Sequence, residues 1–240
     1  MTDLFTAQNI IAFISLAALE IVLGIDNIVF IAIITSRLPA ELQSRMRRLG
    51  LAMAMGQRIV LLLAISWIAR LTDPVLTVLG RGVSGRDLIL LAGGLFLIAK
   101  ATYEIHGTIE GGHDSHGAGD GKKTVSPASI LMQITILDAV FSLDSVITAV
   151  GMVSNVAIMI GAVIVSVIVM MLFANPVSHF ILKHPTVKML ALSFLLMIGF
   201  VLVMDGTGVH VPKAYVYFAM GFSILVEILN FKLRQKAQTK

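Results

Sequence analysis

Two segments of this chain place acidic residues inside long apolar runs. They read EIVLGIDNIVFIAI, from position 20, and DAVFSLDSVITAV, from position 138. In both, an acid is followed six residues later by Asp and then by an amide or hydroxyl residue. These polar residues are Glu20, Asp26 and Asn27 in the first segment, and Asp138, Asp144 and Ser145 in the second. Carboxylate, amide and hydroxyl oxygens are ligands that Mg²⁺, Ca²⁺ and Mn²⁺ prefer. The segments therefore indicate a site for a hard divalent cation.

The surroundings of these acids predict a membrane protein. The chain has 240 residues, of which 57% are hydrophobic and 13% are charged, and its mean hydropathy is +0.93. Its apolar runs reach the ~20 residues that a helix needs to cross a bilayer core of ~30 Å. An ionised carboxylate inside such a helix costs several kcal/mol, so the acids need a compensating partner.

The hydropathy pattern predicts an all-α polytopic fold with seven transmembrane helices in a single membrane domain, 1–240. We expect the spans at about 10–35, 49–70, 87–104, 128–151, 156–175, 187–204 and 213–231. The long connection 105–127 is rich in Gly, His and acidic residues, and we expect it to be mobile. A solvated linker is the main interpretation of its histidines, and capture of metal is the alternative.

The two acidic segments align at a constant offset of 118 residues, and the same offset pairs Gln57 with Asn175. Three spans separate the copies, so they cross the membrane in opposite directions. The sequence thus predicts two inverted three-helix repeats, about 10–104 and 128–204, as is common in secondary transporters. The seventh helix, about 213–231, lies outside the repeat.

The spacing of the acids leaves two arrangements open. Six residues turn a straight helix so that Glu20 and Asp26 point about 120° apart. The two acids can share one cavity if the helix unwinds near Leu23–Gly24, where glycine tolerates a broken backbone. Otherwise they form two successive stations along a path.

Several further residues are candidates for the site. Arg58 lies inside the second span, where it either pins two helices together or acts as a gating counter-ion. Glu227 and Asn230 near the end of the last span are weaker candidates, as are Gln57 and Asn175. The alternative for the acids is a purely structural role, in which they pair with Arg58. Four acids and one intramembrane arginine do not balance in charge, which argues against this alternative.

The distribution of basic residues predicts the orientation. Thirteen Lys and Arg fall on one side of the predicted spans and four on the other, with Arg58 left inside. The richer side faces the cytoplasm. We therefore expect the N-terminus outside and the C-terminus in the cytoplasm. The first residues have no basic region or cleavage site typical of a signal peptide, so we expect the first span to be retained.

The composition also narrows the function. The net charge is +4, but the basic residues lie at predicted membrane edges, so we expect no nucleic-acid partner. The chain contains no cysteine, which excludes disulfides and thiolate chemistry. No P-loop, catalytic triad or HExxH motif occurs, so we expect neither an enzyme nor a resident cofactor.

The segments quoted above, together with HPTVKMLALSFLLMIGFVLV and VPKAYVYFAMGFSILVEILN, resemble the TerC family of integral membrane proteins. The resemblance covers essentially the whole chain and is closest to short bacterial members without CBS domains. It implies seven helices in the bacterial inner membrane, a relation to the LysE-type exporter superfamily, manganese efflux and, by older association, tellurium resistance. It also implies a metal site formed by Glu20, Asp26, Asn27, Asp138, Asp144 and Ser145.

Taken together, the sequence predicts a divalent metal cation transporter. The expected substrate is Mn²⁺, with Ca²⁺ and Mg²⁺ as alternatives, moved outward by alternating access with proton coupling as an option. A membrane scaffold or metal-delivery partner is the first alternative, and an intramembrane metal-dependent hydrolase is the second. The lipid bilayer and the metal ion are the expected partners, and a homo-oligomer is left open.

Overall fold

The computed structural model describes residues 6–64, 73–78, 81–110, 126–153 and 155–238. These residues form helices, apart from one two-stranded hairpin. Chain contacts divide the protein into two compact units, and each is described by itself. The first comprises residues 1–89 and 116–183, and the second comprises 90–115 and 184–240.

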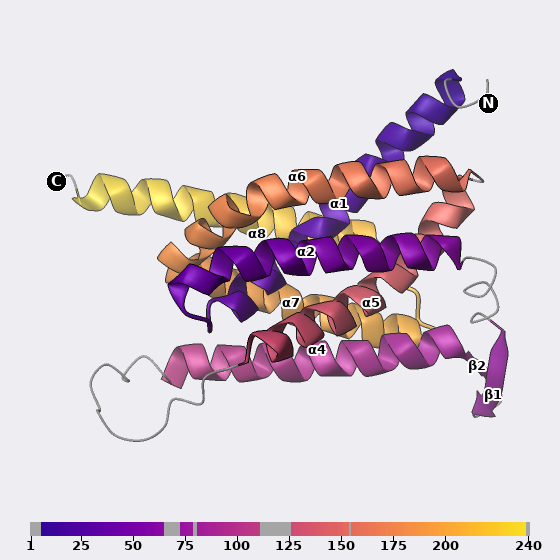
Figure 1. Cartoon of the computed structure of the whole chain (residues 1–240). Helices are drawn as coiled ribbons and strands as arrows, with labels where there is room; N and C mark the ends of the chain where they lie inside the picture. The colour runs from indigo at the N-terminus through magenta and orange to yellow at the C-terminus, as the bar shows by residue number, and fades with distance from the viewer. Residues whose placement is uncertain (1–5, 65–72, 79–80, 111–125, 154, 239–240) are drawn as a thin grey trace. The chain divides into compact units, whose positions relative to one another are not determined.

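The first unit is a bundle of four helices. They are α1 (Ala7–Thr35), α2 (Ala40–Leu63), α5 (Pro127–Met152) and α6 (Val156–Lys183). Helix α1 packs along α6, while α2 packs against both α5 and α6 (Figure 1). The last turns of α1, from Phe30 to Thr35, are buried on all sides, as an evenly apolar sequence requires. The acidic segments of α1 and α5 therefore lie within the packed part of this unit.

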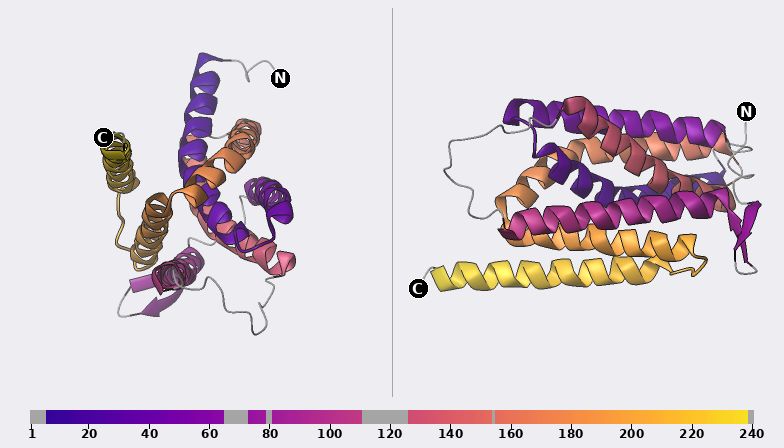
Figure 2. Two further views of the ribbon diagram at one scale, coloured as in Figure 1. Left: turned by 90° about the vertical axis from the view of Figure 1, so that its left-hand side faces the viewer. Right: turned by 90° about the horizontal axis from the view of Figure 1, so that it is seen from below.

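The second unit is built from α7 (Pro185–Gly206), α8 (Lys213–Gln238) and the part of α4 (Gly85–Glu110) that follows Ile89. Its three helices lie side by side, with α7 in the middle (Figure 2). Helices α4 and α7 meet at Gly94 and Gly199, where a side chain added to either glycine would contact the backbone of the other helix. Small residues allow such close approach between helices in membranes.

The helix ends follow the local sequence. Pro127 and Pro185 stand in the first turns of α5 and α7, where the missing N–H of proline costs nothing. Helix α4 begins with a reciprocal cap, in which the backbone N–H of Ser84 donates to Asp87 Oδ2 at 3.0 Å and the N–H of Asp87 donates to Ser84 Oγ at 3.1 Å. This cap supplies partners for two backbone N–H groups at the start of α4.

The structure corrects several predicted boundaries. The connection predicted at 72–86 contains an antiparallel hairpin, β1 (Pro74–Val78) and β2 (Arg81–Ser84). Helices α2, α4, α6 and α8 extend beyond the predicted apolar spans, because polar residues at membrane edges continue a helix without adding hydropathy. Residues 65–70 of the second predicted span and 111–125 of the long connection lie outside the described residues.

Of the two arrangements that the sequence left open, unwinding of α1 near Leu23–Gly24 is not seen in this structure. Helix α1 is continuous from Ala7 to Thr35. Gly24 serves packing instead, because a Cβ there would collide with the sulfur of Met170 on α6. On a continuous helix, Glu20 and Asp26 point about 120° apart, which is the geometry of the second arrangement.

We predict that Gly94→Ala destabilises the second unit by about 1–3 kcal/mol, because overpacking forces the backbones of two helices apart. The added Cβ would lie 2.7 Å from the carbonyl oxygen of Gly199 and 2.8 Å from the backbone nitrogen of Val203. Thermal unfolding of the purified protein in detergent measures the effect. Gly107→Ala, at an open position of the same helix, is the matched control and should leave the melting temperature unchanged or slightly raised.

Candidate functional site

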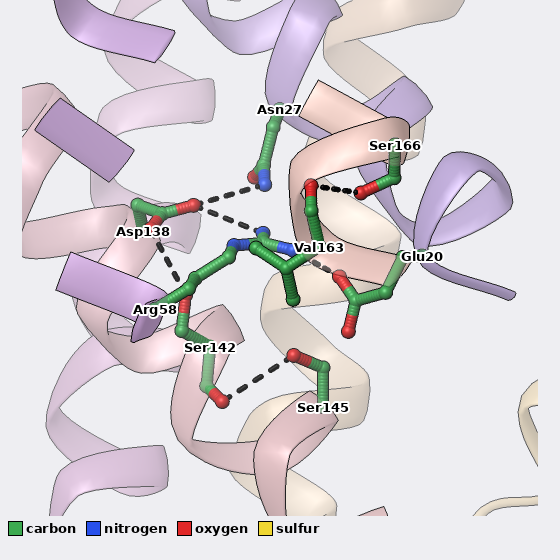
Figure 3. A network of polar contacts seen from close by, with 8 residues as sticks. All are labelled: Glu20, Asn27, Arg58, Asp138, Ser142, Ser145, Val163 and Ser166. Carbon is green, nitrogen blue, oxygen red and sulfur yellow. Dashed lines mark hydrogen bonds and ion pairs between the residues drawn. The ribbon is translucent and has the colours of Figure 1, made fainter. Parts of the chain in front are cut away.

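The centre of the first unit is a buried arginine placed between two acids. Arg58 of α2 donates through Nη1 to Glu20 Oε2 of α1, and through Nη2 to Asp138 Oδ1 of α5 at 3.0 Å (Figure 3). Arg58, Glu20 and Asp138 are 2%, 3% and 4% exposed. The three charged groups thus lie away from solvent and join three helices.

The carboxylate of Asp138 is held by neutral groups as well. Asn27 Nδ2 donates to Asp138 Oδ1 at 3.2 Å, and Ser142 Oγ donates to Asp138 Oδ2 at 2.9 Å (Figure 3). Ser142 lies one turn after Asp138 on α5, so the helix itself brings the hydroxyl to the carboxylate. With Arg58 included, donors from α1, α2 and α5 fix the orientation of this acid. We call Glu20, Asn27, Arg58, Asp138 and Ser142 the central cluster.

The central cluster has more negative than positive charge. One guanidinium faces two carboxylates, so with all three groups ionised one net negative charge remains in a buried environment. Arg58 Nε is buried and has no hydrogen-bond partner within the described part of the chain. A buried ion pair is stable only when the charges balance and the hydrogen bonds are satisfied. The cluster meets these conditions only in part, because its carboxylates outnumber its cation and the Arg58 Nε–H has no acceptor among the described residues.

The residue before Arg58 anchors α2 to α5. With its amide oriented to satisfy both groups, Gln57 donates to the carbonyl of Thr135 at 3.2 Å and accepts from the N–H of Ala139 at 2.9 Å. Both backbone groups flank Asp138 on α5. Gln57 therefore sets the distance between Arg58 and Asp138 without touching either carboxylate of the cluster.

A small cavity adjoins the central cluster. Its polar lining residues are Asn27, Arg58 and Asp138, and the rest of its lining consists of apolar side chains of α1, α2, α5 and α6, among them Leu51 and Met170. The cavity gives a small ion or a water molecule room beside the carboxylate of Asp138.

The structure places the predicted metal ligands in different environments. Glu20, Asn27 and Asp138 come together around Arg58, whereas Ser145 Oγ donates to the backbone carbonyl of Ser142 at 3.3 Å. Asp26 is 8% exposed and has no hydrogen bond or ion pair among the described residues. The side chain of Asp144 lies outside the described residues. Within those residues, no three acidic or histidine side chains group as a metal site would require, so the six-residue site stays a prediction.

The weaker candidates hold helices together. In the second unit, Glu227 of α8 accepts a hydrogen bond from Thr186 Oγ1 of α7 and another from Asn230 Nδ2 at 3.5 Å. In the first unit, Asn175 of α6 contacts Ser44 and Arg47 of α2. None of these residues belongs to the central cluster.

The sequence reasoning missed the role of Ser142 as a ligand of Asp138. Its signal was the spacing of four residues between Asp138 and Ser142 on one helix, which brings the two side chains to the same face. It also missed Arg47, which is buried although it lies among basic residues of a predicted edge. A run such as RMRR gives no indication of which arginine points inward.

The fold and the comparisons define the class of protein. Six helices in the described part of the chain are long and apolar enough to cross a membrane, namely α1, α4, α5, α6, α7 and α8. Helix α2 carries four arginines and does not meet the same criterion. The chain is thus a polytopic α-helical membrane protein. It belongs to the integral membrane protein TerC family, whose model matches residues 5–240, and this confirms the resemblance read from the motifs.

Three relatives illustrate the match. A UPF0053 protein of Haemophilus influenzae is 52% identical over 94% of this chain and 94% of its own length. The UPF0053 inner membrane protein YgdQ of Escherichia coli is 50% identical over 92% of both chains. The UPF0053 inner membrane protein YoaE of Escherichia coli is 51% identical over 90% of this chain but 42% of its own length. No solved structure matches the chain.

We predict that Arg58→Leu destabilises the protein by about 3–5 kcal/mol, because two buried carboxylates are left without their cation. Adding Glu20→Gln and Asp138→Asn to the same chain should restore most of this loss, since no charge then remains unpaired. Thermal unfolding in detergent measures both effects. Arg48→Leu is the matched control, because Arg48 is exposed on the same helix. Equal melting temperatures for Arg58→Leu and wild type would contradict a charged central cluster.

Proposed function

We propose that this protein transports a divalent metal cation across the inner membrane. Glu20 and Asp138 are the central ligands in this proposal, and Arg58 is the counter-ion that neutralises them in part when no cation is bound. The observation that carries the proposal is the central cluster, in which two buried carboxylates from two helices share one guanidinium. Residual negative charge in a membrane interior marks an ion pathway more often than a purely structural contact.

The substrate that we propose is Mn²⁺, with Ca²⁺ and Mg²⁺ as alternatives. The groups around the cavity offer carboxylate and amide oxygens, with the Ser142 hydroxyl close by, and these hard donors suit all three ions. Asp26 is a second station in this proposal because it is buried, unpartnered within the described residues and six positions from Glu20. Asp144 is its counterpart by the sequence alignment.

Alternating access is the mechanism that we propose. The motif offset of 118 residues relates α1 to α5 and α2 to α6. A two-fold relation of this kind exchanges the α1–α6 contact with the α2–α5 contact, and both contacts are present. This pairing supports the inverted repeat on which many secondary transporters depend. The proposed orientation, with the N-terminus outside and the C-terminus in the cytoplasm, rests on the bias in basic residues.

We predict that cells expressing the protein under manganese stress contain less Mn²⁺ than cells without it. Four single substitutions should each abolish this difference in Mn²⁺ content, because each removes a proposed ligand. They are Glu20→Gln, Asp138→Asn, Asp26→Asn and Asp144→Asn. Cellular manganese is measured by elemental analysis at matched levels of membrane-inserted protein. Glu41→Gln is the matched control, since Glu41 is exposed in the first turn of α2, and it should behave as wild type.

The outcomes separate the alternatives. Unchanged manganese with the wild-type protein removes Mn²⁺ as substrate and directs the same assay to Ca²⁺ and Mg²⁺. The protein could lower manganese in cells and yet move no metal when it is purified and reconstituted alone in vesicles. That result would contradict a transporter and favour a scaffold or delivery role. Normal activity of the Glu20→Gln and Asp138→Asn variants contradicts the central cluster as the binding site.

A further inference from the structure

A second buried arginine of the first unit lies where α1 ends and α2 begins. Arg47 of α2 is 8% exposed. Its Nε donates to Asn175 Oδ1 of α6 at 3.0 Å, and its Nη1 donates to Thr35 Oγ1 of α1 at 3.5 Å. Asn175 Nδ2 in turn donates to Ser44 Oγ of α2 at 3.0 Å. We call Thr35, Ser44, Arg47 and Asn175 the end network.

The end network differs from the central cluster in its charge. The hydrogen-bond partners of Arg47 are an amide and a hydroxyl, and among the described residues no carboxylate pairs with it. Thr35 is the last residue of α1, where the negative end of the helix dipole favours a cation. Water can replace neutral partners of this kind more readily than it replaces a buried carboxylate. The end network therefore holds α1, α2 and α6 together through contacts that can be broken at low cost.

The end network lies next to the cavity of the central cluster. Ile31, Leu51 and Met170 line the cavity on α1, α2 and α6. Thr35, Arg47 and Asn175 lie four, four and five residues beyond them on the same helices, which is about one turn of helix in each case. On α1 and α2, Asn27 and Arg58 line the cavity in the opposite direction along the helix. The end network thus lies about one turn beyond the lining residues that are farthest along these helices from Asn27 and Arg58.

A proline adjoins the end network on α6. Pro176 stands inside α6, directly after Asn175. A proline in a helix interior removes the hydrogen bond to the carbonyl four residues earlier, here that of Leu172, and so favours bending at this point. A change of bend at this point would move the Asn175 side chain relative to α2 and would break its contact with Arg47.

We propose that Arg47 is a gating residue that closes the cavity toward the end of the unit at which α1 terminates. Release of Asn175 from Arg47 opens this end and admits a cation to the central cluster. In the closed state the fixed positive charge of Arg47 also repels cations from the passage. The identity of the cation rests on the proposed function. The closure itself does not, because it is defined by whether water reaches the cavity.

The absence of cysteine from the sequence makes the closure measurable. A cysteine introduced at Ala54, a cavity-lining position of α2 that is 5% exposed, reports access through its reaction with a membrane-impermeant thiol reagent. The reagent is applied to vesicles of either orientation. We predict slow labelling in the Ala54→Cys background. Adding Asn175→Ala should raise the rate from one side about tenfold, because the closed state loses a charge-assisted hydrogen bond.

Two further variants keep the test decisive. Arg47→Gln removes the charge and should raise the labelling rate from the same side, even if Asn175→Ala fails to fold. Ser178→Ala is the matched control, because Ser178 is a buried polar residue of α6 outside the end network, and it should leave the rate unchanged. Unchanged labelling in folded Asn175→Ala and Arg47→Gln proteins, or rapid labelling without them, overturns the gate. Gated labelling in a protein that moves no metal overturns the proposed function and leaves the gate standing.

Discussion

The shared guanidinium of Arg58 is the interaction on which the first unit depends. A bilayer offers no water to solvate Glu20 and Asp138, so each acid must find positive charge or hydrogen bonds within the protein. Arg58 supplies both to two helices at once, and this fixes α2 between α1 and α5. Gln57, Asn27 and Ser142 then adjust the fit, since each satisfies a polar group beside Asp138 or orients its carboxylate.

The two buried arginines of α2, Arg47 and Arg58, have partners of different chemistry. Arg58 faces carboxylates, and separating these charges in a buried environment is expensive. Arg47 faces neutral partners, so its contacts break at lower cost. A helix that is fixed at one arginine and releasable at the other can move at one end while its centre stays attached. Between the two lies the cavity, lined on the same helix by Leu51 and Ala54.

Much of this arrangement follows from the sequence, because the motifs and the apolar runs are unambiguous. The polytopic helical fold, the family and the choice of Glu20 and Asp138 as candidate residues could be predicted from them. Partner choice could not, since whether Arg58 bridges one acid or two depends on packing that no local pattern encodes. Gly24 illustrates a second limit: glycine permits unwinding and also close packing, and the sulfur of Met170 on a distant segment decides for packing. The hairpin at 74–84 was missed because its strands are shorter than the window in which hydropathy is read.

The charge excess of the central cluster has a consequence for energetics. In a transporter of divalent cations, binding would change the formal charge of this cluster from one negative to one positive. A membrane potential that is negative inside then opposes both the outward passage of the loaded form and the inward return of the empty form. Each charge moved against it costs about 2.3 kcal/mol per 100 mV. If the empty form carried two positive charges inward, the sign of that step would be reversed, and the potential would favour the return as much as it opposes the exit. An exporter built on this cluster would therefore be indifferent to membrane voltage if it exchanged two monovalent cations for each divalent metal ion.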